Sequence, residues 1–247
     1  MRNQAKEIEE FYLRLLQKAF PSLPQGQPTR SESPDFILLT NAGQVGVEVT
    51  RLFKSPDSQG RHLQAQENER SLMVMEAMRL YEASGNPPVE IHVHMAAQTE
   101  FNKKNRRHFA QTLSRLVGLH VPPDRSWTVI ENDFEKPDLF PFEFDSISIA
   151  RFGHKRNYWN VPDGGWVQEH FMAELQSVIN KKNALLTQFD SSCSMHWLLI
   201  VIEGVSGSTL FEPSHETLNH VYTADFQKVF LLERLTGNGY ELRLGAA

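Results

Sequence analysis

Residues 36–50 combine the signals of a β-hairpin and constrain the fold more than any other segment of the chain. An apolar run opens this segment, turn-forming residues follow at 41–43, and apolar and polar side chains then alternate. Successive side chains of a strand point to opposite faces, so Glu48 and Thr50 should share one face and the neighbouring valines the other. The sequence therefore predicts two antiparallel strands joined by a tight turn.

Two carboxylates are expected to meet at one end of this hairpin. Asp35 stands directly before the first strand, and Glu48 lies late in the second. In an antiparallel pair that folds at 41–43, these positions return to the same end. Carboxylate oxygens are the ligands that Mg²⁺ prefers. The pattern indicates a divalent-cation site; the alternative is an ordinary hairpin whose Asp35 begins a turn and whose Glu48 is solvated.

The order Pro34-Asp35, hairpin, Glu48-Val49-Thr50 resembles the PD-(D/E)xK nuclease superfamily, which has the restriction-endonuclease-like fold. The resemblance implies an α/β core in the order helix, three-stranded meander, helix, strand. It also implies that Asp35, Glu48 and the Val49 carbonyl hold Mg²⁺ or Mn²⁺. In the superfamily a Lys orients the attacking water, and this chain has Thr50 at that position. Thr50 can hydrogen-bond a water but brings no positive charge.

The flanking segments follow the order of elements that the resemblance implies, apart from the first strand. Helical spacing of apolar residues predicts a helix over 4–20, which Pro21 ends. A second helix is expected over 63–83 and a strand over 89–95, and we assign both to the core. The first strand of the meander should lie within 21–33, where the sequence is loop-like.

Both expected helices carry polar candidates for the site. Glu9 lies at the edge of the apolar stripe of the first helix, whereas Glu10 points nearly away from it. Members of the superfamily often carry another acidic residue on this helix, so the resemblance implies Glu9 as a further metal ligand; a solvated helix face is the alternative. The resemblance likewise implies that Gln64 or Gln66, on the second helix, helps to hold the metal-bound water or the phosphate. Helix capping or solvent exposure is the alternative for these two residues.

The C-terminal part is expected to contribute a helix over 167–182, a buried strand over 196–202, and a closing hairpin between 226–232 and 240–244. This layout resembles the C-terminal half of an uncharacterised bacterial branch of the superfamily that carries the same hairpin.

Nucleases of this fold sometimes carry their Lys on a neighbouring element. The resemblance therefore implies Lys182 as the catalytic cation in place of the one missing at Thr50, with Lys181 and Lys54 as alternatives.

Residues 120–165 are irregular, and we interpret them as an insertion within a single domain that spans 1–247. Next to the expected strand over 146–150 lies a basic-aromatic cluster, which can either bind nucleic acid or pack the insertion against the core. Its members are Arg151, His154, Lys155, Arg156, Tyr158 and Trp159.

Two further groups of side chains have a functional and a structural interpretation. The basic run over 102–108 can meet a phosphate backbone or form a solvated helix face. His92 and His94 form a His-x-His pair that can bind Zn²⁺. No further ligand stands at motif spacing, so packing or solvent contact is the favoured interpretation of this pair.

Composition limits the classes of function. The 247 residues carry a formal net charge of −5, which counts against a dedicated, tight nucleic-acid binder but allows a local basic groove. The single Cys193 excludes an internal disulfide and fits a reducing compartment. No apolar run is long enough to span a membrane, so a cytoplasmic protein is expected.

The sequence therefore favours a metal-dependent phosphodiesterase (nuclease), with DNA expected ahead of RNA as its substrate and a homodimer as an assembly that the fold allows. The alternative is a catalytically inactive protein that uses the same fold to bind protein or nucleic acid. Thr50 and the net acidity favour the alternative. No Gly-rich phosphate loop, Gly-x-Ser-x-Gly or His-Glu-x-x-His pattern supports another enzyme class.

Overall fold

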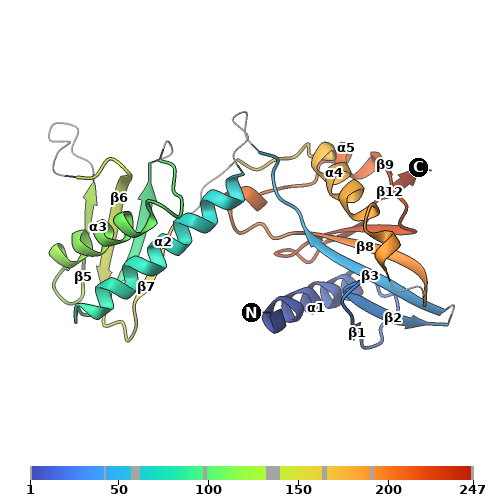
Figure 1. Ribbon diagram of the computed structural model, residues 1–247, viewed down its shortest axis with the longest axis horizontal. Coiled ribbons are helices and arrows are strands. Elements are labelled where there is room, and N and C mark those ends of the chain that lie inside the picture. The colour runs from blue at the N-terminus through green and yellow to red at the C-terminus, as the bar shows by residue number, and fades with distance from the viewer. Residues whose placement is uncertain are drawn as a thin grey trace. The chain divides into compact units, whose positions relative to one another are not determined.

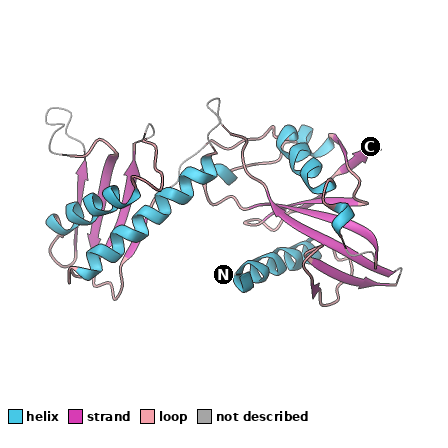
Figure 2. Ribbon diagram, viewed as in Figure 1, coloured by secondary structure: helices cyan, strands magenta, loops and turns pink. Residues whose placement is uncertain are grey.

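The chain divides into two compact units in the computed structural model. Unit 1 comprises Met1–Ser55 and Gly165–Ala247, and unit 2 comprises Pro56–Gly164. Both units mix helices with strands, so the expected α/β class is confirmed (Figures 1 and 2). The residues that the structure describes are 2–41, 43–56, 62–96, 99–131, 140–162, 166–189 and 192–245.

Unit 1 is built on a six-stranded sheet with the order β1-β2-β3-β8-β10-β11. β1, β2 and β3 form an antiparallel meander, β8 runs parallel to β3, and β10 runs parallel to β8. The hairpin expected over 36–50 is therefore confirmed. The strands are β1 (Thr29–Arg30), β2 (Phe36–Thr40), β3 (Gly43–Arg51), β8 (Cys193–Ile202), β10 (Lys228–Glu233) and β11 (Gly239–Glu241).

Two details of this sheet answer open points of the sequence analysis. The first strand of the meander exists, but β1 is only 2 residues long and both are exposed, so it carries no apolar pattern. β10 and β11 pair antiparallel, which confirms the closing hairpin.

Helices cover both faces of the sheet in unit 1. On one face, Leu16 of α1 (Arg2–Ala19) packs in a core with Val47. On the other, Ile179 of α4 (Met172–Asn183) packs in a core with Leu198 and Ile200. The described elements of the unit thus begin α1, β1, β2, β3, α4, β8. The remaining ones are η2 (Leu186–Gln188), η3 (Gly207–Thr209), α5 (His215–Asn219), β9 (Val221–Thr223) and β12 (Arg243–Gly245).

Unit 2 has a four-stranded sheet with the order β5-β6-β4-β7. Its two helices lie on the same face of this sheet (Figure 1), where Tyr81 and Leu113 pack in a core with Ile91 and Ile149. The elements are α2 (Leu63–Ala83), β4 (Glu90–Met95), α3 (Arg106–Leu119), β5 (Ser126–Glu131), β6 (Phe144–Arg151) and β7 (Tyr158–Asn160).

One assignment from the sequence is wrong. The helix over 63–83 and the strand over 89–95 exist as α2 and β4, but they do not join the sheet of the hairpin. β4 pairs with β6 and β7, and the elements that follow β3 in unit 1 are α4 and β8. Apolar periodicity specifies the type of an element, whereas its partner in the sheet depends on contacts between distant residues.

The boundaries of other expected segments also differ. The expected insertion over 120–165 falls almost entirely in unit 2, which begins earlier, at Pro56. The helix expected from 167 begins at Met172. Residues 132–139 of the acidic-aromatic patch lie outside the described residues. Within the described part of the chain, no helix is both long and apolar enough to cross a membrane.

Candidate active site

Asp35 and Glu48 meet across the hairpin, as expected. Phe36 pairs with Val47, so the residue before Phe36 lies opposite the residue after Val47. The Asp35 backbone N–H hydrogen-bonds the Glu48 carboxylate. In return, Asp35 Oδ2 accepts a hydrogen bond from the Val49 N–H at 2.9 Å. The Glu48 carboxylate is thus bonded to the backbone at Asp35, and the Asp35 carboxylate to the backbone of β3.

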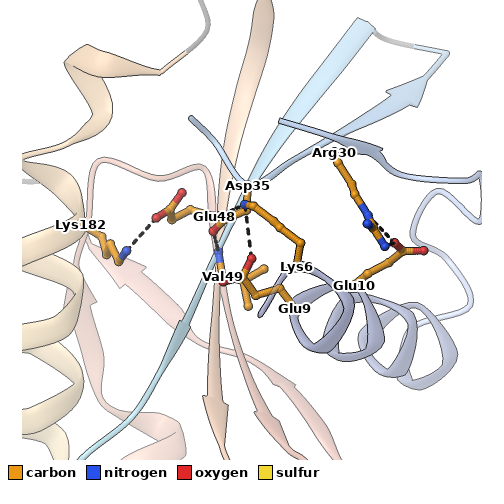
Figure 3. A network of polar contacts seen from close by, with 8 residues as sticks. All are labelled: Lys6, Glu9, Glu10, Arg30, Asp35, Glu48, Val49 and Lys182. Atoms are coloured by element: carbon orange, nitrogen blue, oxygen red, sulfur yellow. Dashed lines mark hydrogen bonds and ion pairs between the residues drawn. The ribbon is translucent and has the colours of Figure 1, made fainter. Parts of the chain in front are cut away.

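Helix α4 brings a lysine to Glu48. Lys182 Nζ lies 2.7 Å from Glu48 Oε1, and both side chains are largely buried (Figure 3). The contact follows from the register of the sheet: Glu48 pairs with Leu198, whose side chain packs in the core beneath α4. Glu48 therefore points to the face that α4 covers, and Val47 points to the face that α1 covers.

Among the lysine candidates, Lys182 is the one that contacts these carboxylates. Lys181 is exposed to solvent. Lys54 Nζ donates a hydrogen bond to the Trp166 carbonyl. Thr50 is half-buried and pairs with Ile200, one step along the same face of the sheet from Glu48.

Helix α1 approaches Asp35 from the other side of the sheet. Lys6 Nζ forms a close ion pair with Asp35 Oδ1 and lies 3.3 Å from Glu9 Oε2 (Figure 3). Lys6 thus lies between Glu9 and Asp35, and the role of Glu9 as a metal ligand stays a prediction. Glu10 points elsewhere, as expected, and its carboxylate binds Arg30 at 2.7 Å.

These five side chains, Lys6, Glu9, Asp35, Glu48 and Lys182, form one electrostatic group, which we call the carboxylate cluster. Burial raises the pKa of Glu48, and the charge of Asp35 raises it further, whereas Lys182 opposes the shift. Burial and Asp35 also raise the pKa of Glu9, against the effect of Lys6. The cluster therefore holds its glutamates in a setting that disfavours their ionised forms.

Lys6 has the opposite balance. Burial alone would lower its pKa, but the hydrogen bond to Asp35 and the attraction of the carboxylates outweigh burial, so the pKa of Lys6 is raised. Sequence reasoning missed this residue. The available signal was its position one helical turn before Glu9, because residues three apart on a helix share a face.

Carboxylate oxygens, which this cluster supplies, are the kind of ligand that a hard divalent cation prefers. Glu9 Oε2 is buried and has no hydrogen-bond partner, although Lys6 Nζ is its ion-pair neighbour. Within the described residues, no three His, Cys, Asp or Glu side chains form a group that could hold a metal ion. The resemblance implies Asp35, Glu48 and the Val49 carbonyl as ligands, with Glu9 as a further one, and these three carboxylates do not form such a group in this structure. Asp35 and Glu48 each face a lysine in this structure.

The other candidates from the sequence lie in unit 2. Gln66 Oε1 accepts a hydrogen bond from the Phe101 N–H at 3.1 Å, and Gln64 is exposed. His92 Nε2 lies 3.0 Å from Glu90 Oε1, two residues earlier on the same strand. His94 is exposed.

The basic-aromatic cluster divides between the interior and the surface of unit 2. Trp159 packs on Tyr81 at 5.2 Å between ring centroids, whereas Tyr158 is exposed. From the basic run over 102–108, Arg106 lies 3.7 Å from Glu69.

Comparisons with known proteins identify no relative of this chain. No protein-family model, no curated protein and no solved structure matches the chain.

Proposed function

We propose that this chain is a divalent-metal-dependent phosphodiesterase that cleaves nucleic acid, with DNA ahead of RNA as its substrate. The observation that carries the proposal is the position of Lys182 Nζ, 2.7 Å from Glu48 Oε1. The chain has Thr50 where the PD-(D/E)xK motif has its Lys. A lysine that reaches the same face of the sheet from α4 supplies the missing positive charge.

The order of elements in unit 1 supports the proposal independently of the motif. The resemblance implies helix, three-stranded meander, helix, strand. Unit 1 has α1, then the meander β1-β2-β3, then α4 and β8. β8 lies directly beside β3, the strand that carries Glu48. Unit 2 enters the chain between β3 and α4, which separates the motif from its lysine in the sequence.

In the proposed site, Asp35, Glu48 and the Val49 carbonyl would hold Mg²⁺ or Mn²⁺, and Glu9 would be a further carboxylate ligand. The bound ion would lower the pKa of a water and stabilise charge on the phosphate. The raised pKa values of Glu9 and Glu48 fit this role, because both come from burial and from the neighbouring negative charge of Asp35. A dication next to these groups relieves that repulsion.

The side chains of the chain itself have separate roles. Lys182 Nζ orients the attacking water and donates to a phosphate oxygen, a preorganised contact made in a largely buried setting. The Thr50 hydroxyl, on the same face of β3, can donate a hydrogen bond to that water. Lys6 balances the charge of Asp35 and Glu9 while no metal is bound.

The test is cleavage of labelled single-stranded DNA, double-stranded DNA and RNA with Mg²⁺, with Mn²⁺ and with a chelator. We expect metal-dependent cleavage by the wild type and a loss of at least about 10²–10³-fold in Asp35→Asn and Glu48→Gln. Glu10→Gln is the matched control, because Glu10 lies on α1 but outside the carboxylate cluster.

Absence of cleavage by the wild type on every substrate with both metals would overturn the proposal. Binding of nucleic acid without cleavage would instead favour the inactive binding protein that the sequence analysis kept as the alternative. Equal cleavage by Glu48→Gln and the wild type would remove the carboxylate cluster from the mechanism.

A further inference from the structure

One face of the sheet in unit 2 is left without a helix in the described part of the chain, since α2 and α3 both pack on the other face. Side chains on this face come from all four strands. We call it the open face and define it as the alternate residues of 127–131 in β5, 146–150 in β6, 90–94 in β4 and 158–160 in β7.

Two aromatic side chains stand at the outer strands of the open face. Trp127 of β5 is 65% exposed, and Tyr158 of β7 is 57% exposed. They belong to one row across the sheet, because Trp127 pairs with Ala150, Ala150 pairs with Glu90, and Glu90 pairs with Tyr158. Large exposed rings in register on one sheet surface form flat platforms on which another planar group can stack.

Within their row, Ala150 and the carboxylate residue Glu90 lie between the two rings, and the neighbouring rows are polar. The central strand β6 contributes Ser146 and Ser148, and β4 contributes His92 and His94 opposite them. The edge of the His92 ring contacts Tyr158, with 6.4 Å between ring centroids. A protein interface would need an apolar centre here. Small hydroxyl and imidazole side chains leave room for flat rings and offer them hydrogen-bond partners instead.

Two cations lie beside this row. Lys155 and Arg156 are exposed in the connection between β6 and β7. This connection is tied to the open face, because His154 Nε2 lies 3.6 Å from Glu90 Oε2 and Glu90 belongs to the row of the two rings. The open face therefore combines stacking surfaces with nearby positive charge.

We propose that the open face of unit 2 binds single-stranded nucleic acid. Bases stack on Trp127 and Tyr158, and backbone phosphates pair with Lys155 and Arg156. A single strand is required because the bases of a duplex are stacked on one another and cannot reach an exposed ring. The choice of nucleic acid as the partner rests on the proposed function, whereas the rings and cations that bind it belong to unit 2.

The salt dependence should be shallow, because the proposal assigns the phosphate contacts to two cations, Lys155 and Arg156, in a chain with a formal net charge of −5. For single strands, log K falls with log salt by roughly 0.7 per phosphate contact, so we expect a slope near −1.4.

The experiment is a fluorescence anisotropy titration of the full chain into a labelled single-stranded oligonucleotide, in chelator so that no metal contributes. We expect Trp127→Ala and Tyr158→Ala to bind roughly 5- to 100-fold more weakly, which corresponds to the loss of about one stacked base. Trp127→Phe keeps a ring and should keep most of the affinity. Trp166→Ala is the matched control, because this tryptophan is 90% exposed in unit 1.

Three results would overturn the inference: no binding by the wild type, equal affinity for a duplex of the same sequence, or equal affinity of wild type and both alanine variants. A general unfolding effect is recognised because Trp127→Phe would then lose affinity as much as Trp127→Ala. Because binding is measured without metal, its failure is distinct from that of the proposed function. Wild-type binding without any cleavage in Mn²⁺ would keep the inference and contradict the proposed function.

Discussion

The two sheets of this protein are covered differently, and their polar side chains differ accordingly. The sheet of unit 1 carries a helix on each face, and its charged groups at β2 and β3 are largely buried. The sheet of unit 2 carries both of its helices on one face and exposes Trp127 and Tyr158 on the other. In unit 1 the charged side chains interact with one another away from water, whereas in unit 2 the aromatic side chains are exposed to solvent.

This difference indicates which kind of work each sheet can do. Charges that are removed from water interact more strongly than exposed ones, so the carboxylate cluster can shift pKa values and act on a reacting group. Exposed aromatic rings are little affected by electrostatic interactions of this kind, but they offer apolar area on which another ring can stack. We therefore propose catalysis for unit 1 and binding of single-stranded nucleic acid for unit 2.

The largest expected effect is on the cleavage rate when Lys182 is substituted. This experiment tests whether Lys182 is functional because of its position next to Glu48 and not because of its charge alone. Lys182→Met should lower the rate of metal-dependent cleavage by about 10²–10³-fold, the usual effect of removing one preorganised donor. Lys182→Arg keeps the charge and should keep part of the rate. Steady-state cleavage assays measure both.

The matched control for this experiment is Lys181→Met, because Lys181 is adjacent in sequence but exposed. We expect it to cleave at the wild-type rate. If both methionine variants lose the same activity, the contact between Lys182 and Glu48 has no special role in cleavage. That result would contradict the claim that the buried lysine acts in the reaction and the exposed one does not.

A smaller effect is expected from Lys6→Met on stability. The substitution leaves Asp35 without its ion-pair partner and should reduce the free energy of unfolding by about 1–3 kcal/mol. Mn²⁺ should restore part of this loss, since a cation replaces the missing positive charge. Urea unfolding with and without Mn²⁺ measures both quantities.

Lys18→Met on the last turn of the same helix is the control for Lys6→Met. It removes only a favourable helix-end charge, worth about 0.3–1 kcal/mol, and should gain no more from Mn²⁺ than the wild type gains. Equal behaviour of the two variants would mean that Lys6 does not balance the cluster.

The smallest expected effect concerns Glu9. Its pKa is raised in the folded protein, so the folded state binds more protons than the unfolded state between the two pKa values. The free energy of unfolding should therefore fall as pH rises through this range. Glu9→Gln removes this loss of unfolding free energy. At pH values above both pKa values of Glu9, the variant should therefore be more stable than the metal-free wild type by about 1 kcal/mol or less. It should make no difference well below the range.

Thermal unfolding between pH 3 and pH 8 in chelator measures this difference. Glu10→Gln serves as the control with the opposite sign, because hydrogen bonds from Arg14 and Arg30 lower the pKa of Glu10. A stabilising effect of Glu10→Gln above the range would contradict the interpretation of both residues.

The sequence was informative where the signals are local. Turn residues and alternation predicted the hairpin, and its antiparallel geometry then predicted that Asp35 and Glu48 meet. Glu9 could be placed because helical periodicity gives the face of a single residue. Each of these inferences uses residues that are close in the chain, either on one helix or on two strands that a single tight turn connects.

The sequence misled where two segments of the same type compete for one place. The chain offers a helix followed by a strand both as α2 with β4 and as α4 with β8, and the first pair follows the hairpin directly. Only the parallel pairing of β3 with β8 decides between them. Tyr158, Lys155 and Arg156 were candidates for binding nucleic acid from the sequence, but Trp127 was missed for a similar reason, because it shares a row with Tyr158 only through two intervening strands.

The most direct test of the central claim is calorimetric titration of Mn²⁺ into the wild type, Asp35→Asn and Glu48→Gln. The claim is that carboxylates from β2 and β3 form a metal site. We expect binding by the wild type and at least about tenfold weaker binding by either variant, a loss of about 1.4 kcal/mol or more. Absence of binding by the wild type, both alone and with nucleic acid, or equal binding by all three proteins would contradict it.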